Sequence, residues 1–171
     1  MPKPTTSPYI EVRNSDIEGK GIFAKHFIPK GAEIIKYTGP RITKKQADKL
    51  CDEDPDGHVF IFKFDKKHDI DGSVLWNTAR YINHTCDPNC ESIHHGDAIW
   101  ITAARNIDKG EELSYDYGFD QDEYINYPCL CGKPNCLGYI IDSDIVEDVL
   151  GTTYLKKIQK KLLRLSKKGK I

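Results

Sequence analysis

Short runs of β-forming residues, each ended within a few positions by glycine or proline, restrict the fold of this chain more than any other feature. Such runs predict a mostly β fold with many short strands and few helices. We expect strands at residues 9–13, 21–25, 33–37, 59–64 and 99–103 and near Leu113. Two helices are predicted besides. One covers 43–51 and opens with a Thr43–Gln46 capping box, and the other covers 144–166, with apolar residues at helical spacing (Leu155, Ile158, Leu162, Leu165).

Length and composition describe one folded domain. The chain has 171 residues, of which 39% are hydrophobic and 30% are charged, so it can bury a core and is neither collagen-like nor wholly disordered. It contains no run of 18 apolar residues, and its first 12 residues include no apolar stretch of signal-peptide length. We therefore expect an intracellular protein that has no membrane partner.

Charge is divided unevenly along the chain. Residues 1–150 contain all 26 acidic residues and 17 of the 25 basic ones, a net charge of −9, whereas residues 151–171 contain eight basic residues and no acid. An acidic body favours cationic substrates, and a basic tail can contact acidic surfaces such as nucleic acid. The alternative for the tail is a solvated amphipathic helix, because no folded DNA-reading motif is visible.

Five of the six cysteines fall into two tight groups, which favours metal ligation. In a chain without an export signal, closely spaced cysteines indicate a metal site more often than disulfides. Cys129, Cys131 and Cys136 supply three thiolates, and a closed structural zinc site takes four ligands. The spacing leaves both Cys86 and Cys90 as candidates for the fourth.

Two short segments combine residue types suited to binding a small molecule. Gly19-Lys20-Gly21 lets the backbone approach a ligand closely, although a tight turn is the simpler interpretation. The segment lacks the third glycine of a dinucleotide fingerprint. Asn83 and His84 place an amide beside an imidazole, and both groups could bind a small cofactor. The alternatives are a surface turn or the site of a Cys/His hydrolase that uses Cys86. A nucleophilic Cys86 would conflict with its use as a zinc ligand.

Residues 114–119 place aromatic side chains at every second position. On a strand, Tyr115, Tyr117 and Phe119 would share one face, which suits a core as well as a binding site. Together with Tyr37, they could line a narrow aromatic tunnel for an alkylammonium group.

Taken together, these segments resemble a SET-domain lysine methyltransferase, most closely the trithorax-type branch. The resemblance covers about residues 9–140, and its motifs occur in the family's order. Residues 19–24 (GKGIFA) resemble the cofactor loop and residues 34–39 (IIKYTG) the strand that follows it. Residues 79–90 (ARYINHTCDPNC) and 110–117 (GEELSYDY) resemble the two signatures, with Thr85 where serine is usual. Residues 129–139 resemble the post-SET zinc segment.

The resemblance implies a fold of small curved β-sheets around a pseudoknot. It implies a SET domain at 9–120 and a post-SET zinc segment at 121–140. Composition and apolar spacing add a flexible lead-in at 1–8 and a basic amphipathic helix at 141–171. The resemblance also implies S-adenosylmethionine as methyl donor and one structural zinc ion. The implied cofactor-binding residues are Lys20, Gly21, Ile22, Phe60, Arg80, Asn83, His84 and Tyr117. The implied zinc ligands are Cys86, Cys129, Cys131 and Cys136, which leaves Cys90 as a buried thiol.

The reaction implied by the resemblance is methylation of the ε-amine of a protein lysine in a basic tail such as a histone's. Tyr117 matches the catalytic tyrosine, and Tyr37, Tyr115 and Phe119 would line the substrate channel. A tyrosine at position 115 implies mainly mono- or dimethyl-lysine as product. The alternative is a catalytically silent SET-like module that binds a peptide.

Partners and location follow from the same resemblance. The basic C-terminal helix could contact nucleic acid or a nucleosome. The expected location is the nucleus in a eukaryote, and the cytoplasm or a secreted effector in a microbe. The sequence leaves the source organism, the target lysine and the oligomeric state open.

Overall fold

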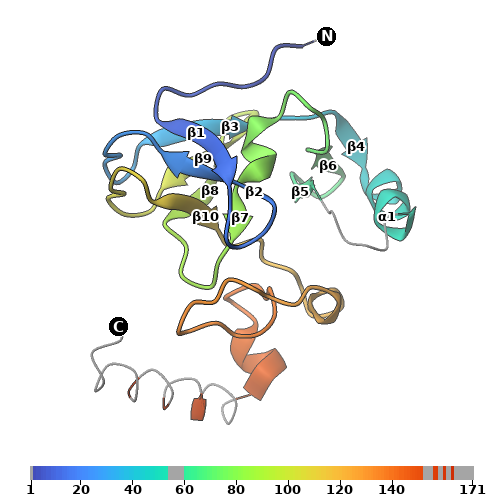
Figure 1. The fold of residues 1–171 in the computed structure, drawn as a ribbon. Helices are drawn as coiled ribbons and strands as arrows, with labels where there is room; N and C mark the ends of the chain where they lie inside the picture. The colour runs from blue at the N-terminus through green and yellow to red at the C-terminus, as the bar shows by residue number, and fades with distance from the viewer. Residues whose placement is uncertain (1, 54–59, 152–155, 158–159, 161–162, 164–171) are drawn as a thin grey trace.

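The regular structure consists mainly of short strands arranged in three small sheets (Figure 1). The computed structural model describes residues 2–53, 60–151, 156–157, 160 and 163. The first sheet has the order β1 (Ile10–Asn14), β2 (Lys20–Ala24), β10 (Glu112–Tyr115), β7 (Asn83–His84). The second is β3 (Glu33–Tyr37), β9 (Ala98–Ala103), β8 (Cys90–His95), and the third is β4 (Arg41–Thr43), β6 (His68–Asp71), β5 (Ile61–Lys63).

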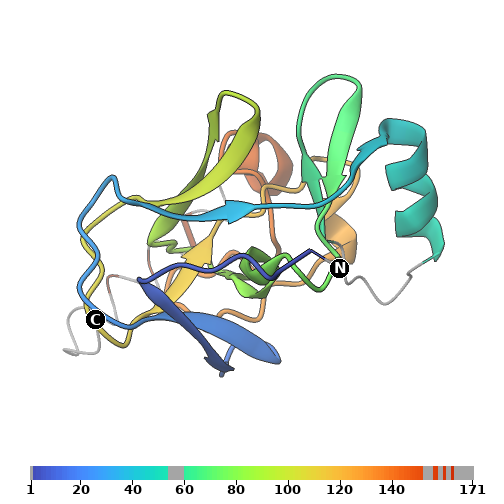
Figure 2. The ribbon, with the colours of Figure 1, turned by 90° about the horizontal axis from the view of Figure 1, so that it is seen from above.

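Helices are few, as the sequence predicts. Among the described residues they are α1 (Lys44–Glu53), the 3-10 helices η1 (Thr78–Tyr81) and η2 (Tyr124–Asn126), and a helical stretch that begins at residue 146. Figure 2 shows α1 at one end of the molecule, next to the third sheet. The predicted mostly β fold of small sheets is therefore confirmed.

The core is built from branched aliphatic side chains of the first two sheets. Isoleucine and leucine dominate because β-branched and aliphatic side chains pack well on a pleated surface. The largest fully buried apolar side chains are Ile22, Ile28, Ile35, Ile82, Ile99, Ile101, Ile107 and Leu113. These residues form a rigid support for the polar groups that follow Ile82 and Leu113 in the chain.

Residues 83–90 are tied closely to β10. The two-residue strand β7 pairs with β10 in parallel, with Asn83 opposite Ser114. Asn89 is buried, and its side chain donates from Nδ2 to Glu112 O (2.8 Å) and accepts at Oδ1 from Ser114 N–H (2.9 Å). The amide of Asn89 thus satisfies backbone groups of β10 that would otherwise be buried without partners.

Most predicted elements are present with shifted ends. The capping box of α1 is confirmed, because Thr43 N–H donates to Gln46 Oε1 (2.9 Å) and Gln46 N–H to Thr43 Oγ1 (3.4 Å). The strand predicted at 59–64 is confined to 61–63 in the described residues. Strands β4, β6, β7 and β8 were not predicted, since their short or polar sequences give no strand pattern.

The two ends of the chain differ in how much the structure describes. Thr5, within the predicted lead-in, is hydrogen-bonded to Trp76 O and to the backbone and hydroxyl of Thr78. Residues 146–151 are helical, and so are the described positions among 156–163. Leu155, Ile158, Leu162 and Leu165, on which the predicted amphipathic helix depends, lie outside the described residues. No helix in the described part of the chain is long and apolar enough to cross a membrane.

Candidate active site and metal centre

A cavity of about 770 Å³ receives side chains from all three sheets. Its walls differ in charge. Near η1 the cations Lys20 and Arg80 outnumber the one carboxylate, that of Glu18. Near α1 and β5 four carboxylates outnumber two lysines; these residues are Asp48, Asp69, Asp120 and Glu123, with Lys44 and Lys63. A cavity of this size, with a few convergent polar groups, is typical of a small-molecule or substrate site.

Three tyrosines and one phenylalanine form an aromatic cluster between these walls. The ring centroids of Tyr115 and Tyr117 lie 4.9 Å apart, and those of Tyr37 and Phe62 also lie 4.9 Å apart. Phe62 stacks on Tyr115 at 6.0 Å and so connects the two pairs. The structure thus brings the three predicted tyrosines together in one cavity and adds Phe62, which sequence analysis missed. Phe62 lies in a predicted strand, but nothing local indicates the direction of its side chain.

The tyrosine hydroxyls are held in different ways. Tyr37 Oη donates to Phe60 O and Tyr117 Oη donates to Ile82 O, each at 2.8 Å. Within the described residues, Tyr115 Oη has no hydrogen-bond partner, although its ring is buried. Burial raises the pKa of all three hydroxyls above the ordinary tyrosine value, so they stay protonated at neutral pH. The cluster therefore presents a neutral, oxygen-bearing wall.

Tyr37 packs against a position that only glycine can occupy. A Cβ atom at Gly72 would lie 2.1 Å from Tyr37 Oη. Gly72 also donates its N–H to Phe60 O (2.8 Å), the carbonyl that accepts from Tyr37. Sequence analysis missed this role of Gly72 in positioning the Tyr37 side chain.

Phe119 lies in the same cavity but outside the tyrosine cluster. Its ring stacks face to face on Tyr127, with centroids 3.8 Å apart. Phe119 is therefore fixed by the segment that follows the strands rather than by Tyr115 and Tyr117.

Asn83 and the residues around Lys20 are held together by a carboxylate. Glu112 Oε1 lies 2.9 Å from Asn83 Nδ2 and accepts a hydrogen bond from Ser15 Oγ (2.7 Å). A Cβ at Gly21 would lie 2.2 Å from the same Oε1 atom, so a larger residue there would push the Glu112 carboxylate away from its present position. Sequence analysis missed the roles of Glu112 and Ser15. The only signal was that Glu112 lies in the 110–117 motif.

The predicted cofactor residues do not all face the cavity. Lys20, Phe60, Arg80, Asn83 and Tyr117 line it. Gly21, Ile22 and His84 are not among its lining residues, and Ile22 is fully buried in the core.

Arg80 is placed by aromatic rings. Its guanidinium lies 4.4 Å from the ring centroid of Phe60 and 5.3 Å from that of Tyr81, and it donates to Ser73 O. Arg80 Nε is buried and has no partner among the described residues. An unsatisfied donor and a positive charge beside the cavity suit a ligand that carries a carboxylate.

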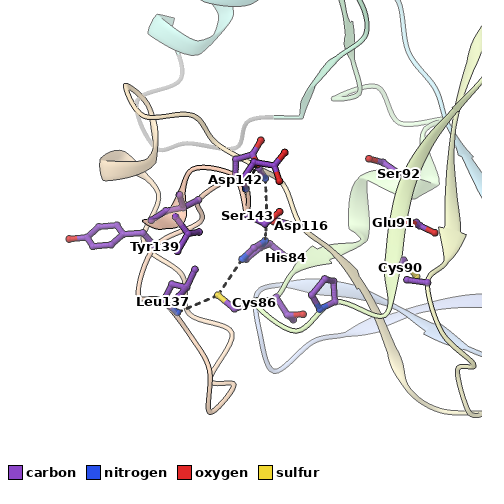
Figure 3. A pocket seen from close by; sticks show the side chains of 17 residues that line it. His84, Cys86, Cys90, Glu91, Ser92, Asp116, Leu137, Tyr139, Asp142 and Ser143 are labelled. Atoms are coloured by element: carbon purple, nitrogen blue, oxygen red, sulfur yellow. Dashed lines mark hydrogen bonds and ion pairs between the residues drawn. The ribbon is translucent and has the colours of Figure 1, made fainter. Parts of the chain in front are cut away.

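His84 contacts Cys86, as Figure 3 shows, and its ring also packs edge-on against that of Tyr117, with centroids 5.5 Å apart. Tyr117 N–H donates to its Nδ1 atom (3.3 Å), which therefore carries no proton. In the neutral ring the proton is on Nε2, which faces Cys86 Sγ at 3.7 Å. His84 thus connects Tyr117 to a candidate metal ligand. It lines a second cavity of about 790 Å³, bordered also by Asp116 and Asp142.

Four cysteines from two distant segments form a compact cluster. The Sγ atoms of Cys86, Cys129, Cys131 and Cys136 all lie within 4.8 Å of one another. Tetrahedral zinc, with Zn–S bonds of about 2.3 Å, separates its sulfur atoms by about 3.8 Å. The donor set and its dimensions therefore fit a zinc ion with four thiolate ligands. Cys90 is not part of the cluster, and burial raises the pKa of its thiol to about 12.

The pKa values of the cluster thiols are consistent with a binding site for a cation. Hydrogen bonds from Cys129 and, to a smaller extent, from His84 and Leu137 N–H hold the pKa of Cys86 below the usual thiol value. The pKa of Cys129 is raised, chiefly because its proton is shared with Cys86. The Cys86 thiolate is therefore stabilised while Cys129 and Cys136, whose pKa values are raised, keep their protons, and a divalent cation would displace these protons on binding.

The segment that carries three of the cysteines folds over Cys86. Cys129 N–H donates to Gly138 O (3.0 Å), which closes the segment on itself. Asn135 Nδ2 donates to Cys86 O (2.8 Å) and Leu137 N–H to Cys86 Sγ (3.5 Å). Residues 129–138 are thus fixed to the end of β7 through Cys86.

Comparison with known proteins finds relatives over most of the chain. The model of the SET domain matches residues 19–118. The histone-lysine N-methyltransferase trr of Drosophila melanogaster is 36% identical over 135 residues, which are 74% of this chain and 6% of the relative. Trithorax, a histone-lysine N-methyltransferase of the same species, is 38% identical over 147 residues (81% and 4%). The H3 lysine-4 specific histone-lysine N-methyltransferase of Schizosaccharomyces pombe is 38% identical over 133 residues (74% and 14%).

The chain spans only a small part of the length of these relatives. The matched range nevertheless contains β2, the tyrosine cluster and the Asn83-His84 pair, whose geometry is described above. The similarity to trithorax and trr confirms the resemblance to the trithorax-type branch that the motifs predict. Since the domain model covers more than half of its residues, the chain belongs to the SET domain family.

Proposed function

We propose that the chain transfers a methyl group from S-adenosylmethionine to the ε-amine of a lysine in a basic protein segment. One observation carries the proposal: a single cavity has one wall with an excess of cations, another with an excess of carboxylates and a tyrosine cluster between them. The first wall suits the carboxylate of the donor. The second suits a basic peptide, and the tyrosines suit an alkylammonium chain.

The donor would be held mainly by residues near η1. Arg80, with its unpartnered Nε, and Lys20 are available for its carboxylate, and Asn83 borders the same part of the cavity. Bound there, S-adenosylmethionine supplies a methyl group attached to a positively charged sulfur. Gly21 and Ile22 are proposed to support this loop from behind rather than through side-chain contacts.

The tyrosine cluster would prepare the lysine. An ammonium group has no lone pair, and the reference pKa of lysine is about 10.4, so the acceptor must first lose a proton. Burial among the apolar ring faces and a nearby positive charge both favour the neutral amine. Tyr37 and Tyr115 would confine the side chain to a narrow path that aligns its nitrogen, which is a proximity effect.

Tyr117 is proposed as the catalytic residue that orients the amine. Its hydroxyl hydrogen is donated to Ile82 O, so its lone pairs are available to an N–H of the substrate. Its raised pKa argues against a role as a strong base, because the hydroxyl stays protonated at neutral pH. Phe119 is proposed to border the entrance of the channel.

One zinc ion held by Cys86, Cys129, Cys131 and Cys136 would have a structural role. Four thiolates close the coordination sphere and leave no position for a catalytic water. The ion would fix residues 129–138 against Cys86 and so support His84, which contacts Tyr117 through its Nδ1 atom.

A histone tail is the proposed substrate. The relatives named above are histone-lysine N-methyltransferases, one of them H3 lysine-4 specific. The carboxylates of the cavity and the net charge of −9 over residues 1–150 support a basic substrate. In a eukaryote such a substrate implies the nucleus. The exposed Lys156, Lys157 and Lys160 are proposed to contact nucleosomal DNA.

Mass spectrometry of core histones and other basic proteins tests this function. The proteins are incubated with S-adenosylmethionine and either the wild-type chain or Tyr117→Phe, whose cofactor binding is measured separately. We expect a methylated lysine with the wild-type chain and none with the variant. No methylation by a wild-type chain that binds the cofactor would overturn the proposal and favour a silent peptide-binding module.

A further inference from the structure

Strand β5 has a free edge that faces the segment following Tyr117. In the third sheet β5 pairs only with β6, so its other edge has no strand partner among the described residues. Residues 118–120 and Glu123 line the same cavity as Phe62 and Lys63 of β5. These two segments therefore meet at the acidic wall of the cavity that holds the tyrosine cluster.

Lys63 connects strand β5 to the segment that follows Tyr117. Its Nζ atom lies 3.1 Å from Asp120 Oδ2 and 3.7 Å from Glu123 Oε2. Asp69, which lies opposite Lys63 in the sheet register, is already paired with Lys44. The ammonium group of Lys63 is therefore directed toward the segment that follows Tyr117 rather than along its own sheet.

The ion pairs of Lys63 with Asp120 and Glu123 are weak enough for another cation to replace Lys63. The side chains of Lys63, Asp120 and Glu123 are 62%, 53% and 47% exposed. Burial alone would raise the pKa of Asp120, but the hydrogen bond and charge of Lys63 outweigh it and hold that pKa below the usual range. Exposed ion pairs contribute little to stability, so an incoming cation of similar geometry can replace Lys63.

We infer that Lys63 is a specificity-determining residue that occupies, in the free protein, the place of a basic side chain of the substrate. A substrate with arginine or lysine beside its target lysine displaces Lys63 and pairs with Asp120 and Glu123. A substrate with a neutral residue at that position must break the ion pairs of Lys63 with Asp120 and Glu123 and forms no new ion pair in return. This inference rests on the proposed function and adds to it a requirement for a basic neighbour of the target lysine.

The test compares two synthetic peptides, each with one acceptor lysine, flanked by arginine in one and by alanine in the other. Their affinities for the full chain are measured by fluorescence anisotropy, and their kcat/KM values with labelled S-adenosylmethionine. Lys63→Met keeps most of the aliphatic stem and removes the charge. It should raise the affinity of both peptides about two- to fivefold, since neither must then displace an exposed ion pair.

Neutralising Asp120 and Glu123 should change the affinities of the two peptides in opposite directions. In the double variant Asp120→Asn and Glu123→Gln, the contact is also broken, so the alanine peptide should bind more tightly. The arginine peptide should bind about tenfold more weakly, because the carboxylates that would hold its guanidinium are gone. A change of the same sign and size for both peptides would show that the double variant acts only through general structure and would overturn the inference.

Lys49→Met is the matched control. Lys49 also makes an exposed ion pair, with Glu53 at 3.5 Å, but within α1 and away from the cavity. If Lys63→Met and Lys49→Met give equal affinities for both peptides, Lys63 has no special role. A chain that binds peptides without methylating them overturns the proposed function, and the affinities alone then decide the inference. A chain that binds neither peptide overturns both.

Discussion

Tyr115 differs from its two neighbours because its hydroxyl has no hydrogen-bond partner among the described residues. The hydroxyl of Tyr115 therefore remains free to bind the substrate amine or a water molecule that limits the space for further methyl groups. Tyr115→Phe removes this oxygen and should shift the product from the mono- and dimethyl-lysine predicted from the sequence toward a higher methyl state. Mass spectrometry of a peptide product at full conversion measures the distribution.

Tyr37→Phe provides the comparison for this prediction. The Tyr37 hydroxyl is already bonded to Phe60 O, so its loss frees no group that faces the amine. We expect Tyr37→Phe to change rate or stability without raising the methyl state. The same methyl distribution for Tyr115→Phe and the wild-type chain would contradict the assignment of Tyr115.

The raised pKa values of Tyr37, Tyr115 and Tyr117 predict loss of stability in alkali. An unfolded tyrosine ionises near pH 10, whereas burial holds these three protonated above that pH in the folded state. The folded chain then binds more protons than the unfolded chain, so the free energy of unfolding falls as the pH rises above about 10. Below that pH their contribution is fully present.

Tyrosinate absorbance and circular dichroism, recorded together against pH, test this prediction. The three buried tyrosines should ionise only together with unfolding. A single ionisation step, complete before any loss of circular dichroism, would show that the tyrosine cluster is open to solvent.

Site residues were predictable where a local pattern carries the chemistry. The spacing of Cys129, Cys131 and Cys136 indicates a metal site, because thiolates close in sequence can reach one ion. The contact of Lys63 with Asp120 joins residues 57 positions apart, and no local pattern encodes it. The packing of Gly72 on Tyr37 Oη is equally invisible, since glycine in a turn needs no other explanation.

At the scale of elements, hydrophobic patterning predicted the strands that face the core. β3 and β9 contain isoleucine runs and were predicted nearly to the residue. β8 has one buried residue, Cys90, and five exposed ones, so it carries no apolar alternation that could be recognised. β7 has two residues and exists because β10 lies beside it, which is a tertiary effect.

The zinc segment is an element whose order should depend on its ion. Beyond its few backbone contacts, residues 129–138 are held by the cluster itself. Chelation, or Cys131→Ser, should release zinc, abolish methyl transfer and lower the melting temperature by at least about 5 °C. Zinc content by elemental analysis, together with thermal melts, measures this. Cys51→Ser is the control for zinc content and melting temperature, because Cys51 lies on α1 outside the cluster. Methyl transfer is not compared in this variant, since Cys51 lines the cavity.

Full activity after verified removal of zinc would contradict the structural role of the ion. Retained zinc in Cys131→Ser would show instead that three thiolates and a water suffice. The first result would show that His84, which contacts Cys86 Sγ, keeps its position without the metal.

On the scale of the whole molecule, the separation of charge determines how a basic substrate is drawn to the chain. The acids of residues 1–150 include those at the cavity, and their field attracts a cationic peptide before contact. The eight basic residues of 151–171 act in the opposite direction. Salt screens the acidic and the basic field alike. Whether kcat/KM falls or rises with salt therefore reveals which of the two fields dominates at the cavity.

We expect the acidic field to dominate, because its carboxylates line the cavity itself. For an arginine-flanked peptide, kcat/KM should fall about three- to tenfold between about 50 mM and about 500 mM NaCl. The alanine-flanked peptide should change much less, and cofactor affinity, measured in parallel, controls for general effects of salt. A kcat/KM that rises with salt would mean that the basic tail governs approach to the site, either by repelling the peptide or by occupying the acidic wall.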